Sequence, residues 1–253
     1  MIDLHSHILR GIDDGARTLE DSLDIARAAV ADGIVAIAGT PHVRDDWPTE
    51  AALMEERVAE LRAALEAEGI PLDVFSGGEI SIGYLPLLEP DELGRFALGG
   101  SRHLLVETPY YGWPLALPDL LASLLDQGFV PVLAHPERNA EVAANLQALV
   151  PLVDSGVLIQ VTAASLDGRI GRRAFECARL LVREGLAHLL ASDAHHASVR
   201  EVGMAEAATS VGNPALARWL TWDVPAAILA DEKIPPRPRV KSGKRWLDWL
   251  LET

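Results

Sequence analysis

The sequence is poor in cysteine, in basic residues and in long apolar runs. Cys177 is the single cysteine among 253 residues, which excludes an intramolecular disulfide and suits a reducing compartment. Lys and Arg number 22 against 37 Asp and Glu, so the net charge is −15. This balance disfavours nucleic acid as a partner, because proteins that bind phosphate backbones usually present a basic surface.

No apolar stretch reaches the roughly 18 residues that a membrane-spanning helix needs, and a strand-like run follows Met1 directly. We therefore expect no transmembrane segment, no targeting segment and a cytoplasmic location. The length and the hydrophobic content of 49% allow one domain with a substantial core.

Apolar strand-like runs alternate with helical patterns, which predicts βαβ units and a parallel sheet. The runs cover residues 2–4, 34–38, 72–75, 103–106, 130–134, 157–161 and 188–191. After the first run, Thr18-Leu-Glu-Asp21 resembles a capping box, with Asp in place of the usual Glu, and predicts the start of a helix. The next helix is predicted to bury a stripe at Met54, Val58, Leu61 and Leu65.

The composition changes near the end of the chain. After Asp231 it becomes basic and proline-rich, and it closes with Trp246-Leu-Asp-Trp-Leu-Leu251. We interpret residues 1–232 as one α/β barrel domain and residues 233–253 as a basic tail. This tail is expected to be an exposed linker with a small helix that docks back through its tryptophans. The alternative is a contact with a partner or a membrane surface.

Side chains that can bind metals recur where the runs end. His5 and His7 share one face of an extended strand, and functional groups in such barrels gather at the carboxyl ends of the strands. The candidate ligands are five histidines and four acids: His5, His7, Asp14, His42, Glu79, Glu107, His135, Asp193 and His195. Nitrogen and oxygen ligands without thiolate favour Mn, Fe or Zn. The set is too large for one ion.

Single positions have simpler interpretations. Asp14 lies in Gly11-Ile-Asp-Asp-Gly15, which is typical of a turn, Glu107 could be a strand-end charge, and Asp193 could cap a helix. The recurrence favours metal binding, since every run except the one at residues 157–161 ends near a ligand-type residue. Three further histidines are interpreted as surface or hydrogen-bonded residues: His103, His188 and His196.

The order of the motifs resembles the PHP superfamily. The motifs are His5-x-His7, Gly11-Ile-Asp-Asp-Gly15, Thr40-Pro-His42, Gly77-Gly-Glu79, Ala134-His-Pro-Glu-Arg138 and Ser192-Asp-Ala-His195. More narrowly, the chain resembles the bacterial metal-dependent protein-tyrosine phosphatases associated with capsule and exopolysaccharide biosynthesis. The chain differs from the family in Asn139, where relatives often have tyrosine, and in its basic tail.

The resemblance implies a distorted (β/α)7 TIM-like barrel of the PHP type with three divalent ions, expected to be Mn2+. The first ion would take His5, His7, Glu79 and Asp193; the second Glu79, Glu107 and His135; the third Asp14, His42 and His195. The catalytic arginines that bind phosphate would be Arg138 and Arg200. The expected partner is a phosphotyrosine protein, such as a cognate bacterial tyrosine kinase, and a homo-oligomer is compatible with the resemblance.

The expected reaction is hydrolysis of a phosphomonoester. A hydroxide bridging two ions would attack phosphorus in line, and the two arginines would bind the phosphate oxygens through their planar forks. A phenol has a pKa of about 10, so a phenolate leaves without much help from a side-chain acid.

Cys177-Ala-Arg-Leu-Leu-Val-Arg183 fits the Cys-x5-Arg pattern of cysteine-dependent tyrosine phosphatases. We reject that chemistry, because residues 172–184 have the pattern of an amphipathic helix instead of a phosphate-binding loop. The helix is predicted to bury Ala174, Phe175, Ala178 and Leu181.

The loop Thr108-Pro-Tyr-Tyr-Gly-Trp-Pro114 follows Glu107 and carries three aromatic residues. Tyr110, Tyr111 and Trp113 either stack on a phosphotyrosine ring or only stiffen and pack the loop. Three other functions stay open: a small-molecule phosphatase such as a histidinol-phosphate phosphatase, a PHP nuclease, and a non-catalytic PHP binding module.

Overall fold

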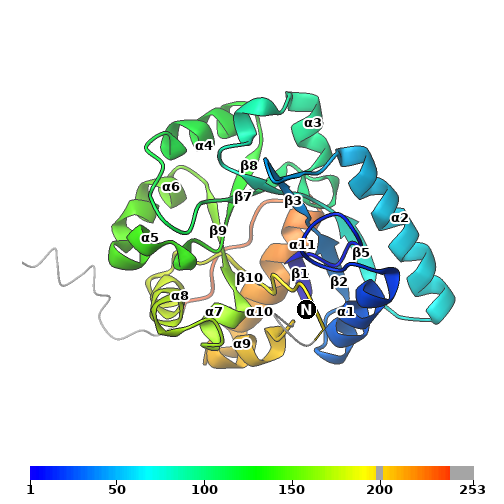
Figure 1. The fold of residues 1–253 in the computed structure, drawn as a ribbon. Helices are drawn as coiled ribbons and strands as arrows, with labels where there is room; N and C mark the ends of the chain where they lie inside the picture. The colour runs from blue at the N-terminus through cyan, green and yellow to red at the C-terminus, as the bar shows by residue number, and fades with distance from the viewer. Residues whose placement is uncertain (198–201, 240–253) are drawn as a thin grey trace, which may run out of the picture.

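The structure is a computed structural model that describes residues 1–197 and 202–239. It is a mixed α/β fold in which the strands lie in the middle and the helices surround them (Figure 1). The strands are β1 (Ile2–Ser6), β2 (Ala36–Gly39), β3 (His42–Arg44), β4 (Trp47–Pro48), β5 (Asp73–Ser76), β6 (Glu79–Ser81), β7 (His103–Glu107), β8 (Val130–Ala134), β9 (Leu158–Thr162) and β10 (Leu189–Ala191). The helices are α1 (Leu19–Ala31), α2 (Ala51–Glu68), α3 (Pro90–Arg95), α4 (Leu117–Asp126), α5 (Ala140–Ala144), α6 (Val150–Asp154), α7 (Ala163–Leu166), α8 (Arg172–Glu184), α9 (Met204–Ser210), α10 (Pro214–Arg218) and α11 (Val224–Leu229).

The strands form two sheets that do not join into one closed sheet. One has the order β1-β2-β5, and the other has the order β10-β9-β8-β7-β6-β3-β4. All pairs are parallel except the β3–β4 hairpin. The chain passes from β2 into β3 through Thr40 and Pro41, and from β5 into β6 through Gly77 and Gly78. Residues 36–44 and residues 73–81 therefore each contribute one strand to the first sheet and one strand to the second.

Each of the seven predicted runs overlaps an observed strand, whereas β3, β4 and β6 were not predicted. Their brevity explains this, because a run of two or three residues is too short to show an apolar periodicity. The capping box of α1 is confirmed: Asp21 N–H donates to Thr18 Oγ1 at 3.1 Å, and Thr18 N–H donates to Asp21 Oδ2 at 2.9 Å. The buried stripe of α2 is also confirmed.

The first strand meets the end of the last one. His7 N–H donates to the carbonyl of Ala194 at 2.8 Å, and Asp193 N–H donates to the carbonyl of His5 at 2.8 Å. Ser6 and Ala194 form an isolated parallel bridge between the two segments. Candidate ligands of the first strand and of the segment after the last strand are thereby brought to one edge of the strands.

The first part of the tail packs against the domain, so the prediction of an exposed linker is wrong for residues 234, 235, 237 and 238, which are half-buried. The Trp219 indole N–H donates to the carbonyl of Pro235 at 2.9 Å, and Arg237 Nη1 donates to the carbonyl of Ala187 at 3.0 Å. The tryptophan-containing part of the tail, residues 240–253, lies outside the described residues.

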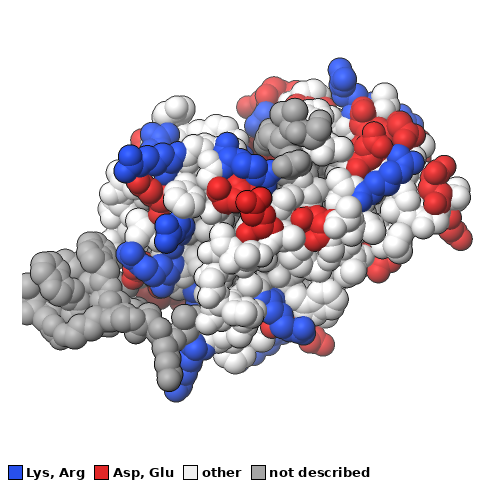
Figure 2. All heavy atoms as spheres, turned by 90° about the horizontal axis from the view of Figure 1, so that it is seen from below, with Lys and Arg blue, Asp and Glu red and all other residues white. Residues whose placement is uncertain are grey.

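Among the described residues, no helix combines the length and the apolar composition needed to cross a bilayer. On the face shown in Figure 2, acidic and basic side chains of the described residues are interspersed. This mixture lacks the continuous basic surface that phosphate-backbone binding usually requires.

Candidate metal centre

The structure brings the nine predicted ligands together at the carboxyl ends of the strands. Eight of them are buried, and the Asp14 side chain is 45% exposed. His42 and Glu79 open β3 and β6, so they lie inside the second sheet, at the point where each segment leaves the first. The groups whose ligand atoms lie within 4.8 Å of one another are His7–Asp14–His42–His195, His5–His7–Asp193, His5–Glu79–His135 and His42–Glu79–Glu107.

Glu79 lies close to four imidazoles of the centre. Its side chain is fully buried, and its oxygens lie 2.7 Å from His42 Nδ1 and 2.8 Å from His135 Nε2. The Nε2 atom of His5 is 3.3 Å away, and that of His7 is 3.5 Å away. In this position the two oxygens of Glu79 could contact two different ions, which is the arrangement that the resemblance implies.

Two aspartates also lie close to the histidines of the centre. Asp14 Oδ1 lies 3.3 Å from the Nε2 atoms of both His42 and His195. Asp193 Oδ1 lies 3.3 Å from His7 Nε2 and 3.5 Å from His5 Nε2. Asp193 has a φ of 52°, in the region that favours glycine, which is the kind of backbone strain that functional sites retain.

The residues fit divalent cations. Several buried polar atoms make no hydrogen bond of good geometry within the described part of the chain: His5 Nε2, His7 Nε2, His42 Nδ1 and Glu79 Oε2. Leaving such atoms unsatisfied is costly, and imidazole nitrogens facing carboxylate oxygens are the donor set that Mn, Fe or Zn accepts.

Burial and close contacts shift the pKa values of several side chains of the centre. Burial and the nearby Glu79 raise the pKa of Glu107 to about 7. Burial lowers the pKa of His135 to about 4, although Glu79 opposes this. Burial also lowers the pKa of His42, but the nearby carboxylates of Asp14 and Glu79 outweigh it and raise the pKa to about 9. The pKa values of His42 and His135, two histidines of the same centre, are therefore shifted in opposite directions.

Two residues that were not predicted hold the imidazoles in place. Asp13 Oδ2 lies 2.6 Å from His7 Nδ1 and accepts the backbone N–H of His42 at 3.0 Å. Gln160 Oε1 lies 3.0 Å from His5 Nδ1 and accepts the backbone N–H of His135 at 3.3 Å. Each acceptor favours the tautomer with hydrogen on Nδ1, so that Nε2 faces the centre.

The turn that carries Asp13 and Asp14 depends on Gly15. A Cβ atom at Gly15 would overlap the carbonyl oxygen and the Cβ atom of His7. Asp13 Oδ1 also accepts the Gly15 N–H at 2.9 Å. The turn interpretation therefore applies to Asp13, whereas the Asp14 side chain faces His42 and His195.

Arg138 lies at the rim of the centre, where its Nη2 atom is 2.6 Å from Asp193 Oδ2. Burial alone would raise the pKa of Asp193, but Arg138 and His5 hold it well below its usual range. Arg200 lies outside the described residues. A further arginine, Arg44 on β3, lies 3.5 Å from Glu107 Oε2 and was not predicted.

The aromatic residues of the 108–114 loop have three different environments. Tyr110 lies beside the centre, with its ring centroid 6.1 Å from that of His135 and its hydroxyl 3.5 Å from Arg138 Nη1. Tyr111 is 75% exposed, and Trp113 packs against the hydrophobic core. Only Tyr110 among these three is placed to contact a ligand of the centre.

Two of the three remaining histidines have structural contacts. His103 is buried, with Nδ1 3.2 Å from Ser101 Oγ, and His188 Nδ1 accepts the Ile159 N–H at 3.1 Å. His196 is half-buried. None of them belongs to the groups of possible metal ligands found among the described residues.

Cys177 lies on α8, which has the predicted bounds, Arg172–Glu184. Burial and the charge of Glu137 raise the pKa of its thiol to about 12. A thiol of this kind is a poor nucleophile at neutral pH. The predicted burial of this helix is correct except at Phe175, which is half-buried at the edge of a groove.

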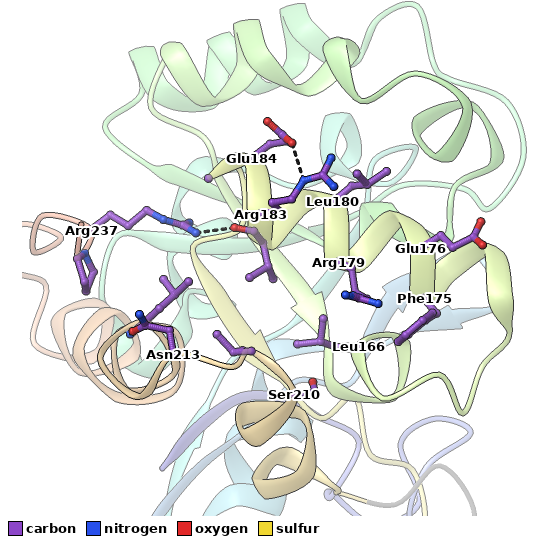
Figure 3. A pocket seen from close by; sticks show the side chains of 15 residues that line it. Leu166, Phe175, Glu176, Arg179, Leu180, Arg183, Glu184, Ser210, Asn213 and Arg237 are labelled. Carbon is purple, nitrogen blue, oxygen red and sulfur yellow. Dashed lines mark hydrogen bonds and ion pairs between the residues drawn. The ribbon is translucent and has the colours of Figure 1, made fainter. Parts of the chain in front are cut away.

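That groove, of about 760 Å3, lies between α8 and the α9–α10 segment (Figure 3). Phe175, Arg179 and Leu216 line it, and Arg237 reaches it from the C-terminal segment. Its lining includes neither Arg138 nor any of the nine candidate ligands. The candidate functional site is therefore the ligand cluster and not this groove.

Comparisons with known proteins agree on one family. A family model described as capsular polysaccharide synthesis, CpsB/CapC, matches residues 1–224. The tyrosine-protein phosphatase YwqE of Bacillus subtilis is 39% identical over 210 residues, covering 82% of both chains. CapC of Staphylococcus aureus is 31% identical over 196 residues, covering 77% of both. One solved structure matches with a TM-score of 0.84 at 35% identity, and the match covers 95% of this chain and 100% of that chain. Its description is of YwqE from Bacillus subtilis and CpsB from Streptococcus pneumoniae as unique metal-dependent tyrosine phosphatases.

Proposed function

The chain belongs to the CpsB/CapC family of capsular polysaccharide synthesis, and on this basis we propose that it is a metal-dependent protein-tyrosine phosphatase. The observation that carries the proposal is the buried cluster of imidazoles and carboxylates, with unsatisfied atoms at its centre and Arg138 at its rim. Such a cluster supplies metal binding and phosphate binding in one place.

We propose that the cluster holds three divalent ions, of which Mn2+ is the expected species. His5, His7, Glu79 and Asp193 would hold the first; Glu79, Glu107 and His135 the second; Asp14, His42 and His195 the third. The observed groups differ in detail, since His7 also lies with the third set and Glu107 lies with His42 and Glu79. When bound, such ions activate water at neutral pH and neutralise phosphate charge.

The chain's own residues bind and orient the phosphate. Arg138 offers N–H groups in a planar fork, and its contact with Asp193 fixes the guanidinium at the rim. Arg200 is proposed as the second phosphate-binding arginine. Tyr110 lies next to Arg138, where the aromatic part of a phosphotyrosine substrate would follow its phosphate. No side-chain acid is required, because a phenolate with a parent pKa of about 10 leaves readily.

We further propose that the substrate is a tyrosine kinase of capsule or exopolysaccharide biosynthesis, and that both act in the cytoplasm. The two sheets are proposed to act as one distorted seven-stranded barrel over residues 1–232. Support for this comes from the segments that contribute to both sheets and from the Ser6–Ala194 bridge between the first and last strands. Residues 233–253 are proposed to be a basic tail whose first part packs on this domain.

The test is elemental analysis of protein purified without chelator, together with hydrolysis of a phosphotyrosine peptide. We expect bound divalent metal and hydrolysis that Arg138→Ala reduces by about 100-fold or more in kcat/KM, as for loss of a charge-stabilising group. Arg95→Ala, on an exposed ion pair, is the matched control. A large preference for histidinol phosphate would instead identify a small-molecule phosphatase, and protein without metal would indicate a binding module.

A further inference from the structure

Asn139 connects the phosphate-binding segment to the aromatic loop. It directly follows Arg138 and is the N-cap of α5, where its Oδ1 atom accepts the N–H groups of Glu141 at 2.9 Å and Val142 at 3.0 Å. The residue is 1% exposed. Half of its amide is therefore used to start a helix.

The other half of the amide holds the loop. Asn139 Nδ2 donates to the carbonyl of Pro109 at 2.7 Å and to that of Gly112 at 3.1 Å, on either side of Tyr110 and Tyr111. These contacts fill the hydrogen-bonding capacity of the amide, with two accepted and two donated bonds. The network also fixes its orientation, because a rotated amide would point its NH2 group at two backbone N–H groups.

Two more bonds join the same elements. Ala140 N–H donates to the carbonyl of Tyr110 at 3.0 Å, and Gly112 N–H donates to Glu141 Oε2 at 3.1 Å. The loop is therefore attached to the first turn of α5 at Pro109, Tyr110 and Gly112. The Tyr110 ring is held beside His135 and Arg138 as a result.

We propose that Asn139 is a positioning residue that fixes Tyr110 beside the phosphate-binding arginine, and that Tyr110 contacts the aromatic ring of the substrate. Together they select aryl over alkyl phosphate monoesters. This inference rests on the proposed phosphatase function and specifies its substrate class. A ring that is held in place before binding loses little conformational freedom when it packs on the substrate, which favours selectivity.

Asn139→Asp separates this role from helix capping. An aspartate keeps the Oδ1 acceptor and caps α5 as well as asparagine does, but it cannot donate to Pro109 and Gly112. Asn213→Asp is the matched control, because Asn213 Oδ1 caps α10 through the Leu216 N–H at 2.9 Å, away from the centre. Tyr110→Leu removes the ring directly, and Tyr111→Leu removes an exposed ring of the same loop.

The experiment measures inhibition constants of phenylphosphonate and methylphosphonate, which are not hydrolysed, in the metal-loaded enzyme. We expect Tyr110→Leu and Asn139→Asp each to reduce the preference for phenylphosphonate by about 3- to 10-fold, as for loss of one aromatic contact. The constant for methylphosphonate should stay unchanged. Asn213→Asp and Tyr111→Leu should keep the wild-type preference.

Melting temperatures of all four variants show whether each is folded. An unchanged preference in Asn139→Asp, or an equal loss for both phosphonates, would overturn the positioning role. An unchanged preference in Tyr110→Leu would overturn the ring contact even if Asn139→Asp does not fold. Failure of the proposed function is read separately, from the absence of phosphotyrosine hydrolysis by the wild-type enzyme.

Discussion

His7 and Asp13 form a close side-chain contact beside the centre, with Nδ1 and Oδ2 2.6 Å apart. Both side chains are buried, and the carboxylate also accepts the backbone N–H groups of Gly15 and His42. Asp13 therefore fixes one ligand by its side chain and a second, His42, by its backbone. A residue of this kind acts on the metals through the ligands that it orients.

We expect Asp13→Asn to weaken metal binding by about 10- to 100-fold, because the amide can present its NH2 group to His7 and no longer fixes the tautomer. Titration with Mn2+ against a competing chromogenic chelator measures this. Asp45→Asn, at an exposed position of the β3–β4 turn, is the control and should bind as the wild type does. Equal affinities for the two variants would contradict the orienting role.

Gln160 should have the same role for His5, with a neutral acceptor. Gln160→Leu is expected to lower metal affinity by about 10-fold or more, whereas Gln160→Glu keeps an acceptor and should preserve it. The 15N chemical shifts of the His5 ring in metal-free protein report the tautomer independently of activity. Hydrogen on Nδ1 in the wild type and in Gln160→Glu, with a mixture in Gln160→Leu, is the expected pattern; the same tautomer in all three would count against it.

Asp13 and Gln160 show which parts of the site could not be predicted from the sequence. The alternation of runs and helices predicted the strand order along the chain, and ligand-type residues after the runs predicted the centre, because side-chain type and spacing are local properties. Gln160 gave a weaker signal, a polar residue inside an apolar run. Residues 11–15 were interpreted as a turn around Asp14, and Asp13 does accept the Gly15 N–H there. The contact of Asp13 with His7, however, depends on how the loop packs. Long-range pairing of this kind has no local signature.

The reactive group can be tested with one substitution and one chelator. Cys177→Ser should keep the wild-type kcat/KM on a phosphotyrosine peptide, because the thiol is buried in a helix and its pKa is raised to about 12. Treatment with a chelator should abolish the activity, and added Mn2+ should restore it. The metal mechanism would be refuted if a folded Cys177→Ser enzyme lost its activity while the wild-type enzyme stayed active in the presence of the chelator.

Acid stability should depend on His188. Burial and the nearby Arg237 lower the pKa of its ring to about 4. In the unfolded chain the pKa is about 6.5, so the unfolded state binds the proton first as the pH falls. The stabilisation is present above pH 6.5 and is lost between about pH 6.5 and 4, by about 1 to 3 kcal/mol. Urea unfolding across this range should show a shallower decline for His188→Gln; parallel curves would contradict this.

The meeting of β1 with the end of β10 also constrains when the protein can acquire its metals. His5 and His7 are made among the first residues of the described chain, whereas Asp193 and His195 follow the last strand. On the ribosome, the early histidines have no carboxylate partner from the far end until translation has passed His195. The proposed sites of the first and third ions therefore become complete only after Asp193 and His195, respectively, have been made, whereas the ligands of the second, Glu79, Glu107 and His135, are all made earlier.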